Sequence, residues 1–343
     1  MSKQTRSVRA TLTEQQSPPG AGRIRVVGPN PAMDRLQVLP HLAPHEVNRA
    51  VETTSLPGGK SLIVARTARR LGIVPVLYGF LGGNIGAFVR QGCLTLGMED
   101  RHSDTAEETR ITTVLIEQDT GRSTVVNEKG PIISRQEQDH LRKQIIQDSR
   151  SGDFVALTGS LPQGVTADFY GQMVPVIQAT GARVILDASG EALRLGAAAA
   201  PWAVKCNADE FAVMRDGNLP FENEQTLLEA MDAQLQAGTS LVIITLGAHG
   251  LIASTRECIW RVQPPAVTAI NPTGSGDTFL GAFLVACLQG HQIGEALVLG
   301  TAAAAANAAS LEPDLGTSPD LGDFVAAVTT STSLPSQNVR AAL

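Results

Sequence analysis

The chain has 343 residues, of which 43% are hydrophobic and 17% are charged, and its formal net charge is −6. This charge argues against nucleic acid or an anionic membrane as the main partner, whereas a small anionic substrate needs only a local basic pocket. The longest apolar run, residues 279–288, is too short to span a bilayer, and the first residues contain no secretory apolar segment. We therefore expect a cytoplasmic protein. Its four widely spaced cysteines predict buried free thiols.

Residues 1–22 are polar and are predicted to form a disordered tail. Their arginines and serines, with a single acidic residue, also fit an organelle transit peptide, and this alternative stays open. Residues 24–28 form a short β-type run that predicts the first central strand. Prolines end this strand and leave Asp34 at its carboxyl end, where ligands bind in open α/β sheets. Asp34 either contacts a ligand or caps the turn.

Loose alternation of polar and apolar residues marks three segments as antiparallel strands, namely residues 35–54, 110–117 and 123–127. We expect a small sheet, a lid inserted discontinuously into the main domain at about residues 35–56 and 101–127. The domain itself is predicted to cover residues 23–330, with a flexible C-terminal tail at 331–343. A lid sheet with exposed edges would also allow a homodimer.

A glycine pair opens the next predicted helix, which runs to about Leu71. The string Pro57-Gly58-Gly59-Lys60-Ser61 is not a P-loop, because that motif requires a glycine at the position of Thr54. Gly58, Gly59 and Lys60 nevertheless place a cation beside a helix start, which suits a sugar oxygen or a phosphate.

Strand and helix patterns then alternate, which predicts a mostly parallel central sheet covered by helices on both faces. Strands are predicted at residues 74–80, 154–157, 184–186, 203–205 and 241–244, and helices at 85–96, 134–150, 168–179 and about 300–311. Polar residues follow these strands and would share one rim of the sheet, where such folds bind ligands. They are Asp34, Gly59, Lys60, Gly159, Ser160, Asp187, Asn207, Glu210, residues 245–250 and residues 274–277.

Residues 271–283 pass from a glycine-rich turn, Gly274-Ser275-Gly276-Asp277, directly into an apolar helix. The free N–H groups and the dipole of a helix start form an anion site. Our hypothesis is that the turn holds a transferring phosphoryl group while Asp277 takes a proton from the attacking hydroxyl. The helix start is expected to lower the pKa of Asp277.

Several motifs follow one another in a fixed order over roughly residues 23–328. They are Asn30-Pro31-Ala32-Met33-Asp34, Asn127-Glu128-Lys129-Gly130-Pro131, Thr158-Gly159-Ser160-Leu161-Pro162, Asp187-Ala188-Ser189-Gly190, Lys205-Cys206-Asn207-Ala208-Asp209-Glu210 and the Gly-x-Gly-Asp turn. This set resembles the PfkB (ribokinase-like) carbohydrate kinases, in the branch with 1-phosphofructokinase and tagatose-6-phosphate kinase. The resemblance implies an α/β, ribokinase-like three-layer sandwich with a mostly parallel central sheet and a small β-sheet lid.

The resemblance also implies roles for individual residues. Asp277 would be the catalytic base, and the amides of Gly274, Ser275 and Gly276 the anion hole. Asp34 would bind sugar hydroxyls, while Gly58, Gly59, Lys60 and Arg110 would hold the acceptor and its existing phosphate. ATP would contact Asn207, Gly276, Asn307 and the loop of Thr245, Leu246, Gly247, Ala248, His249 and Gly250, the His249 side chain being a bystander. Glu210, with Asn207, would help to place Mg²⁺ through water.

One stretch departs from the pattern that the resemblance implies, Lys-Gly-x-Asn-x-Ala. Here Ser61 stands at the glycine and Ile63 at the asparagine, a usual sugar or phosphate contact. The first hypothesis is an ATP- and Mg²⁺-dependent kinase of fructose 1-phosphate or tagatose 6-phosphate. The alternatives are a kinase of another sugar or a nucleoside, and a catalytically weak sugar-phosphate-binding protein.

Other polar residues have ordinary interpretations. His41 and His45 have a helical metal-pair spacing, but Pro40 and Pro44 predict a surface loop. Arg66 and Arg90 are expected to be solvated on helices, and Asp187 either joins the site or caps the next helix.

Overall fold

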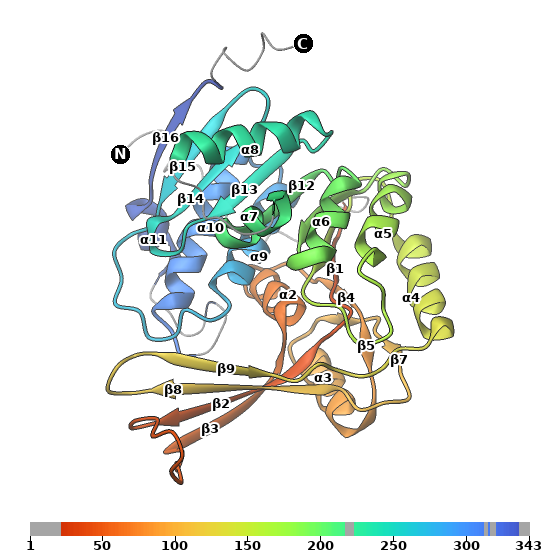
Figure 1. Ribbon diagram of the computed structural model, residues 1–343, viewed down its shortest axis with the longest axis vertical. Coiled ribbons are helices and arrows are strands. Elements are labelled where there is room, and N and C mark those ends of the chain that lie inside the picture. Colours follow the sequence, from red (N-terminus) through yellow and green to blue (C-terminus); the bar gives the residue numbers. More distant parts are fainter. Residues whose placement is uncertain (1–21, 217–222, 312–314, 316–319, 336–343) are drawn as a thin grey trace.

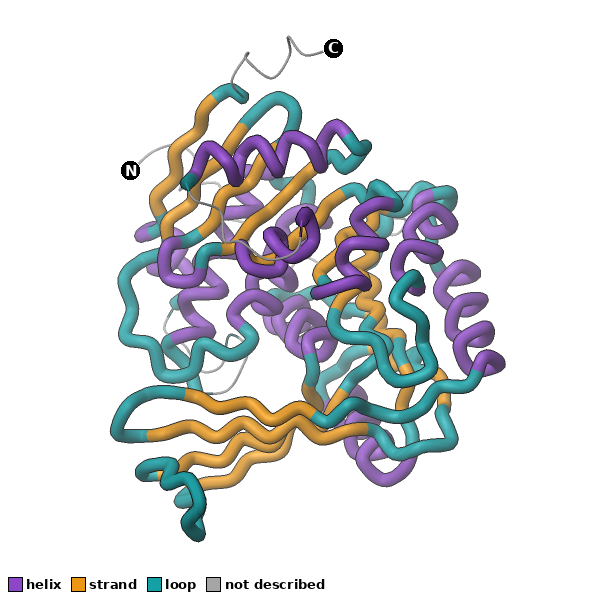
Figure 2. The backbone as a smooth tube through the Cα atoms, in the orientation of Figure 1, coloured by secondary structure: helices purple, strands orange, loops and turns teal. Residues whose placement is uncertain are grey.

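The computed structural model describes residues 22–216, 223–311, 315 and 320–335. A ten-stranded central sheet has the order β16-β15-β14-β13-β12-β11-β10-β1-β4-β6. Figures 1 and 2 show strands of this sheet among the helices. Its parallel part consists of β1 (Ile24–Val27), β4 (Val76–Tyr78), β6 (Glu99–Asp100), β10 (Phe154–Thr158), β11 (Arg183–Asp187), β12 (Ala203–Asn207) and β13 (Leu241–Thr245). The antiparallel extension consists of β14 (Leu251–Ser254), β15 (Ile259–Gln263) and β16 (Thr329–Ser333).

Helices cover both faces of this sheet and make it the middle layer of three. One face carries α2 (Lys60–Arg70), α3 (Gly83–Thr95), α9 (Ser275–Leu288), α10 (Ile293–Ala308) and α11 (Leu321–Ala327). The other carries α4 (Arg135–Asp148), α5 (Phe169–Gln178), α6 (Gly190–Ala198), α7 (Ala208–Asp216) and α8 (Glu224–Gln236). Side chains of β10 show how the layers form: Phe154 and Ala156 enter one core, while Val155 and Leu157 enter the other. The predicted fold class is confirmed.

A separate four-stranded sheet, hereafter the lid, has the order β3-β2-β8-β9 and lies across one end of the main body (Figure 1). Its strands are β2 (Ala32–Leu39), β3 (Glu52–Gly58), β8 (Arg110–Glu117) and β9 (Ser123–Asn127). The strand predicted at 35–54 is in fact two strands joined by a loop at residues 40–51. Residues 101–109 lie outside the lid: β7 (Ser103–Asp104) pairs with β5 (Phe80–Leu81).

The two predicted tails have different outcomes. The N-terminal one lies outside the described residues, apart from residue 22. The C-terminal one was predicted to begin at residue 331, which is wrong, because β16 extends to Ser333 and pairs with β15. Serine and threonine alternation without apolar residues hid this edge strand. Two of the four cysteines, Cys258 and Cys287, are partly exposed rather than buried.

None of the described helices combines the length and the apolar character that crossing a membrane requires.

Candidate active site

The start of α9 has the backbone geometry of an anion site. Gly274 is its N-cap in the left-handed conformation, with φ of 79°, and no side chain caps the helix. The Ser275 amide donates to the Pro272 carbonyl oxygen at 3.2 Å, so this predicted anion-hole amide already has an acceptor. Among the described residues no acceptor meets the amides of Gly274 and Gly276. These two N–H groups can bind an anion together with the helix dipole.

Asn307 supports this helix start through the hydrogen bonds of its side chain. Its side chain is fully buried, and its amide nitrogen donates to the Thr273 carbonyl oxygen at 3.1 Å and to Ser275 Oγ at 2.9 Å. Its Oδ1 accepts from Thr278 Oγ1 at 3.2 Å. Every polar atom of this side chain is used within α9 and the turn before it, and the nucleotide contact of Asn307 stays a prediction.

Two lysines from distant segments converge on Asp187. Lys205 Nζ donates to Asp187 Oδ2 at 2.9 Å, and Lys60 Nζ lies 3.4 Å from Asp187 Oδ1. A Cβ on Gly276 would lie only 3.0 Å from Lys205 Nζ, so this ammonium sits against the proposed anion hole. Asp187 is fully buried and Ser189, not Asp187, is the N-cap of α6, so the capping alternative is wrong. The pairing with Asp187 raises the pKa of Lys60.

Asp277 is in the first turn of α9 and is 7% exposed. Burial raises its pKa from 3.8 to about 7; Lys60 and Lys205 oppose this rise and Asp187 adds to it. The expected lowering of the pKa is therefore wrong, because loss of hydration outweighs the helix dipole and the lysines. A carboxyl group with a pKa near 7 is suited to accept a proton at neutral pH.

Asp34 lies in β2 of the lid and is 5% exposed. Both of its carboxylate oxygens accept from the Gly59 amide at 3.2 Å, which ties the lid to the start of α2. Burial raises its pKa to about 6, against the lowering effect of the Gly59 hydrogen bond and the nearby Arg110.

Arg110 was predicted to hold a phosphate, but its guanidinium group is largely occupied by the protein. Nε and Nη2 each donate to the Asn30 carbonyl oxygen at 3.1 Å. Nη1 donates to Thr112 Oγ1 and to Asn127 Oδ1, both at 3.1 Å. This network joins the lid to the loop after β1, which leaves little capacity for an anion.

Two cavities meet at Asp277. The first, which we call the acceptor cavity because residues predicted to bind the acceptor line it, has a volume of about 770 Å³ and lies between the lid, α2 and the loop after β10. The second, which we call the nucleotide cavity because residues predicted to contact ATP line it, has a volume of about 780 Å³ and lies between β12, β13, α9 and α10. Both are lined by Lys60, Glu210, Gly274 and Asp277. A group transferred from one cavity to the other would therefore pass these four residues.

Only some of the residues predicted to bind the nucleotide line the nucleotide cavity. Thr245, Gly247, Ala248 and Gly250 line the nucleotide cavity, whereas Leu246 and His249 do not. Leu246 packs on the core and His249 is exposed. Asn207 and Glu210 also line the cavity and bond reciprocally, each amide donating to the other side chain at 2.8–3.0 Å.

Three further points were missed from the sequence. Lys205 had no predicted role, although a lysine within the apolar strand Ala203–Asn207 was a usable signal. The prolines and alanines of residues 264–269 and of α10 that line the nucleotide cavity gave no signal. Arg66 is 4% exposed and Arg90 pairs with Asp100 at 2.6 Å, so neither is a solvated residue as expected.

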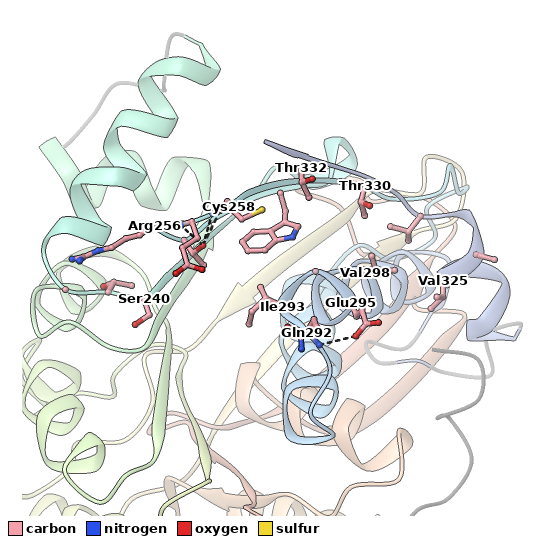
Figure 3. A pocket seen from close by; sticks show the side chains of 18 residues that line it. Ser240, Arg256, Cys258, Gln292, Ile293, Glu295, Val298, Val325, Thr330 and Thr332 are labelled. Carbon is pink, nitrogen blue, oxygen red and sulfur yellow. Dashed lines mark hydrogen bonds between the residues drawn. The ribbon is translucent and has the colours of Figure 1, made fainter. Parts of the chain in front are cut away.

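Two other features carry no site. A third cavity of about 950 Å³ lies between the β14–β15 turn, the start of α10 and β16 (Figure 3). Its polar groups bond locally, as when the Gln292 amide donates to Glu295, and none of the unpartnered buried atoms of the described residues lies there. On the lid, ligand atoms of His41, Glu117 and Asp119 lie within 4.8 Å of one another. Glu117 already accepts from the Leu42 amide, and His41 lies in an exposed loop as expected.

A helix-start anion site and a buried carboxyl group between two cavities fit the class of small-molecule kinases. Residues 30–319 match the family described as pfkB family carbohydrate kinase, and the chain belongs to this family. It is an ATP-dependent sugar kinase.

Solved structures agree with this assignment. One is a protein described as a candidate phosphofructokinase from Staphylococcus aureus, with 26% identity, a TM-score of 0.76 and coverage of 91% of this chain and 100% of that one. Another is phosphofructokinase-2 from Escherichia coli, with 24% identity, a TM-score of 0.83 and coverage of 89% and 98%. A possible 1-phosphofructokinase from Thermotoga maritima is 18% identical, with a TM-score of 0.79 and coverage of 91% and 99%. The last two show the shared fold.

Proposed function

We propose that the protein transfers the terminal phosphoryl group of ATP to a hydroxyl of a phosphorylated ketohexose of the fructose 1-phosphate or tagatose 6-phosphate type. The observation that carries this proposal is the meeting of the two cavities at Asp277 and Gly274. The E. coli relative phosphofructokinase-2 was solved with fructose-6-phosphate, which supports a phosphosugar acceptor.

Asp277 is the general base of this proposal. The acceptor oxygen bonds to phosphorus as the bond from phosphorus to the leaving ADP oxygen breaks, and the hydroxyl proton passes to the Asp277 carboxylate. A loose transition state needs this proton to leave only late, so a base with a pKa near 7 is sufficient. The amides of Gly274 and Gly276, with the ammonium groups of Lys60 and Lys205, stabilise the charge on the transferred group.

Mg²⁺ fits the donor set on the nucleotide side. Glu210 and Asn207 supply oxygen ligands of the kind that Mg²⁺ takes together with water and phosphates, and Glu210 lines both cavities. The ion would neutralise phosphate charge when bound. Glu210 would hold it through water, since one carboxylate oxygen accepts from the Asn207 amide.

On the acceptor side, Asp34 would accept from sugar hydroxyls. The existing phosphate needs a cation other than Arg110, and Lys129 is the candidate. Lys129 lines the acceptor cavity beside Ser160, and the structure assigns its side chain no partner among the described residues. The lid would exclude water, so that ATP is not hydrolysed. A homodimer through the lid stays a prediction; one structure of the E. coli relative is tetrameric.

A substrate panel tests the proposal. ADP release is measured with fructose 1-phosphate, tagatose 6-phosphate, fructose 6-phosphate, ribose and adenosine. The expected result is turnover of a phosphorylated ketohexose well above the unphosphorylated compounds. Turnover of ribose or adenosine alone would replace the acceptor, and retained ATP binding with no turnover of any compound would refute a kinase.

A further inference from the structure

The acceptor cavity has an apolar wall in a place where a sugar would meet polar groups. Ile63 in α2 lines this cavity together with Val114 of β8 and Val125 of β9. Val114 and Val125 are directly opposite each other across the lid ladder. The wall is therefore built from three elements, and Ile63 of α2 lies about 50 or more positions before the two valines in the sequence.

Ile63 is a buried hydrophobic residue that lies outside the clustered core beneath α2. Its neighbours Leu62, Val64 and Ala65 all pack in the core beneath α2, whereas Ile63 belongs to none of the three hydrophobic clusters of the described residues. It is only 4% exposed, so it is covered without being packed in those clusters. Val125 is 40% exposed, in a strand whose residues after Ser123 are all exposed, and it lines the acceptor cavity. Both side chains thus present carbon to the acceptor cavity.

The wall lies close to the reacting end of the acceptor. Ile63 follows Lys60 by three residues, so it lies about one helical turn along the same face of α2. Lys60 lies at the junction of the two cavities with Asp277. A sugar hydroxyl directed at this wall would lose water and gain no hydrogen bond.

We propose that the preferred acceptor is a deoxy-sugar phosphate, which lacks a hydroxyl on the edge that faces Ile63, Val114 and Val125, near the reacting carbon. This inference deepens the proposed function and rests on it. Asp34 and Asp277 keep the polar contacts for the remaining hydroxyls, while the apolar wall sets which hydroxyl is absent.

Matched pairs of acceptors test the idea: 3-deoxyfructose 6-phosphate against fructose 6-phosphate, and 4-deoxyfructose 1-phosphate against fructose 1-phosphate. For each pair kcat/KM is measured by ADP release, and Kd by calorimetry with a non-hydrolysable ATP analogue. We expect the deoxy member of the best pair to be favoured by about tenfold or more in both quantities, the order of an unsatisfied buried hydroxyl. Equal values, or preference for the hydroxylated member in every pair, would overturn the inference.

Variants connect the preference to the wall. Ile63→Asn supplies an amide and should reverse the ratio within the best pair, whereas the matched control Ile63→Leu should preserve it. Val125→Thr adds a hydroxyl at a partly exposed strand position that tolerates it, and should shift the ratio in the same direction if Ile63→Asn does not fold. An unchanged ratio in both polar variants contradicts the assignment of the wall. Absence of turnover would refute the kinase proposal instead, and the ratio of Kd values would still decide the present inference.

Discussion

Replacing Asp277 by asparagine should remove the activity and at the same time stabilise the protein above neutral pH. Asparagine keeps the size of the side chain but cannot accept the proton. Because general base catalysis contributes about 10²- to 10⁴-fold, we expect kcat to fall by that factor. The affinity for ATP should be nearly unchanged, because the amides of Gly274 and Gly276 remain.

The stability effect follows from the raised pKa of Asp277. Its pKa is about 7 in the folded protein and 3.8 in an ordinary environment, a difference of about 3, which corresponds to about 4 kcal/mol. A raised pKa means that the folded protein holds the proton more tightly than the unfolded chain. The associated stability is fully present below about pH 4 and is lost as the pH rises through about 7.

The assay is chemical denaturation between about pH 3.5 and pH 8, analysed for the free energy of unfolding. Asp277→Asn should match the wild type at the acid end and exceed it by up to about 4 kcal/mol at pH 8. Asp139→Asn, on the exposed side of α4, is the control and should leave the pH profile unchanged. If Asp277→Asn is no more stable at pH 8, or if it retains a near-normal kcat, the reasoning about this carboxyl group is wrong.

Three further substitutions test other parts of the site. Lys205→Met removes the partner of the buried Asp187, so it should lower the free energy of unfolding by about 3–5 kcal/mol and reduce kcat. Chemical denaturation measures the first quantity and ADP release the second. If neither changes, the ion pair is dispensable. Lys129→Gln should raise the KM for the phosphorylated acceptor about tenfold and leave the KM for ATP unchanged. The control Lys143→Gln, on the exposed side of α4, should change neither value. An equal effect of the two substitutions would show that Lys129 is not the phosphate ligand. Asn307→Ala removes the hydrogen bonds that support the turn before α9. We expect the free energy of unfolding, measured by thermal denaturation, to fall by about 1–3 kcal/mol and kcat to fall with it. Loss of ATP affinity alone would instead favour the predicted nucleotide contact.

Local features of the fold were predictable because short stretches of sequence determine them. Ser134 and Glu137 gave a capping box, and the structure has both of its hydrogen bonds at the start of α4. Likewise, the glycine turn at residues 274–276 predicted the helix start of α9. The alternation of strands and helices then predicted the central sheet, since parallel strands need crossover helices.

Properties that depend on distant residues were not predictable. The pKa of Asp277 depends on burial under segments far away in the sequence, and local reasoning from the helix dipole gave the wrong direction. Asp187 contacts Lys60 across 127 positions, and Arg110 contacts the Asn30 carbonyl across 80. No local pattern reports whether a charged group is paired in the folded chain.

The same distinction between local and distant contacts explains why the reaction is easier to predict from the sequence than the acceptor. Phosphoryl transfer depends on consecutive residues that hold the anion and the base, so a single turn of sequence carries most of the information. The acceptor cavity is assembled from β2, α2, β8, β9 and the loop after β10, and each contributes between one and five of the residues that line it. A substitution such as Ile63 can therefore change which sugar is bound without disturbing Asp277 or the lysines. For this reason the choice of acceptor is best sought in the wall of Ile63, Val114 and Val125, where the chain is free to vary while its chemistry is retained.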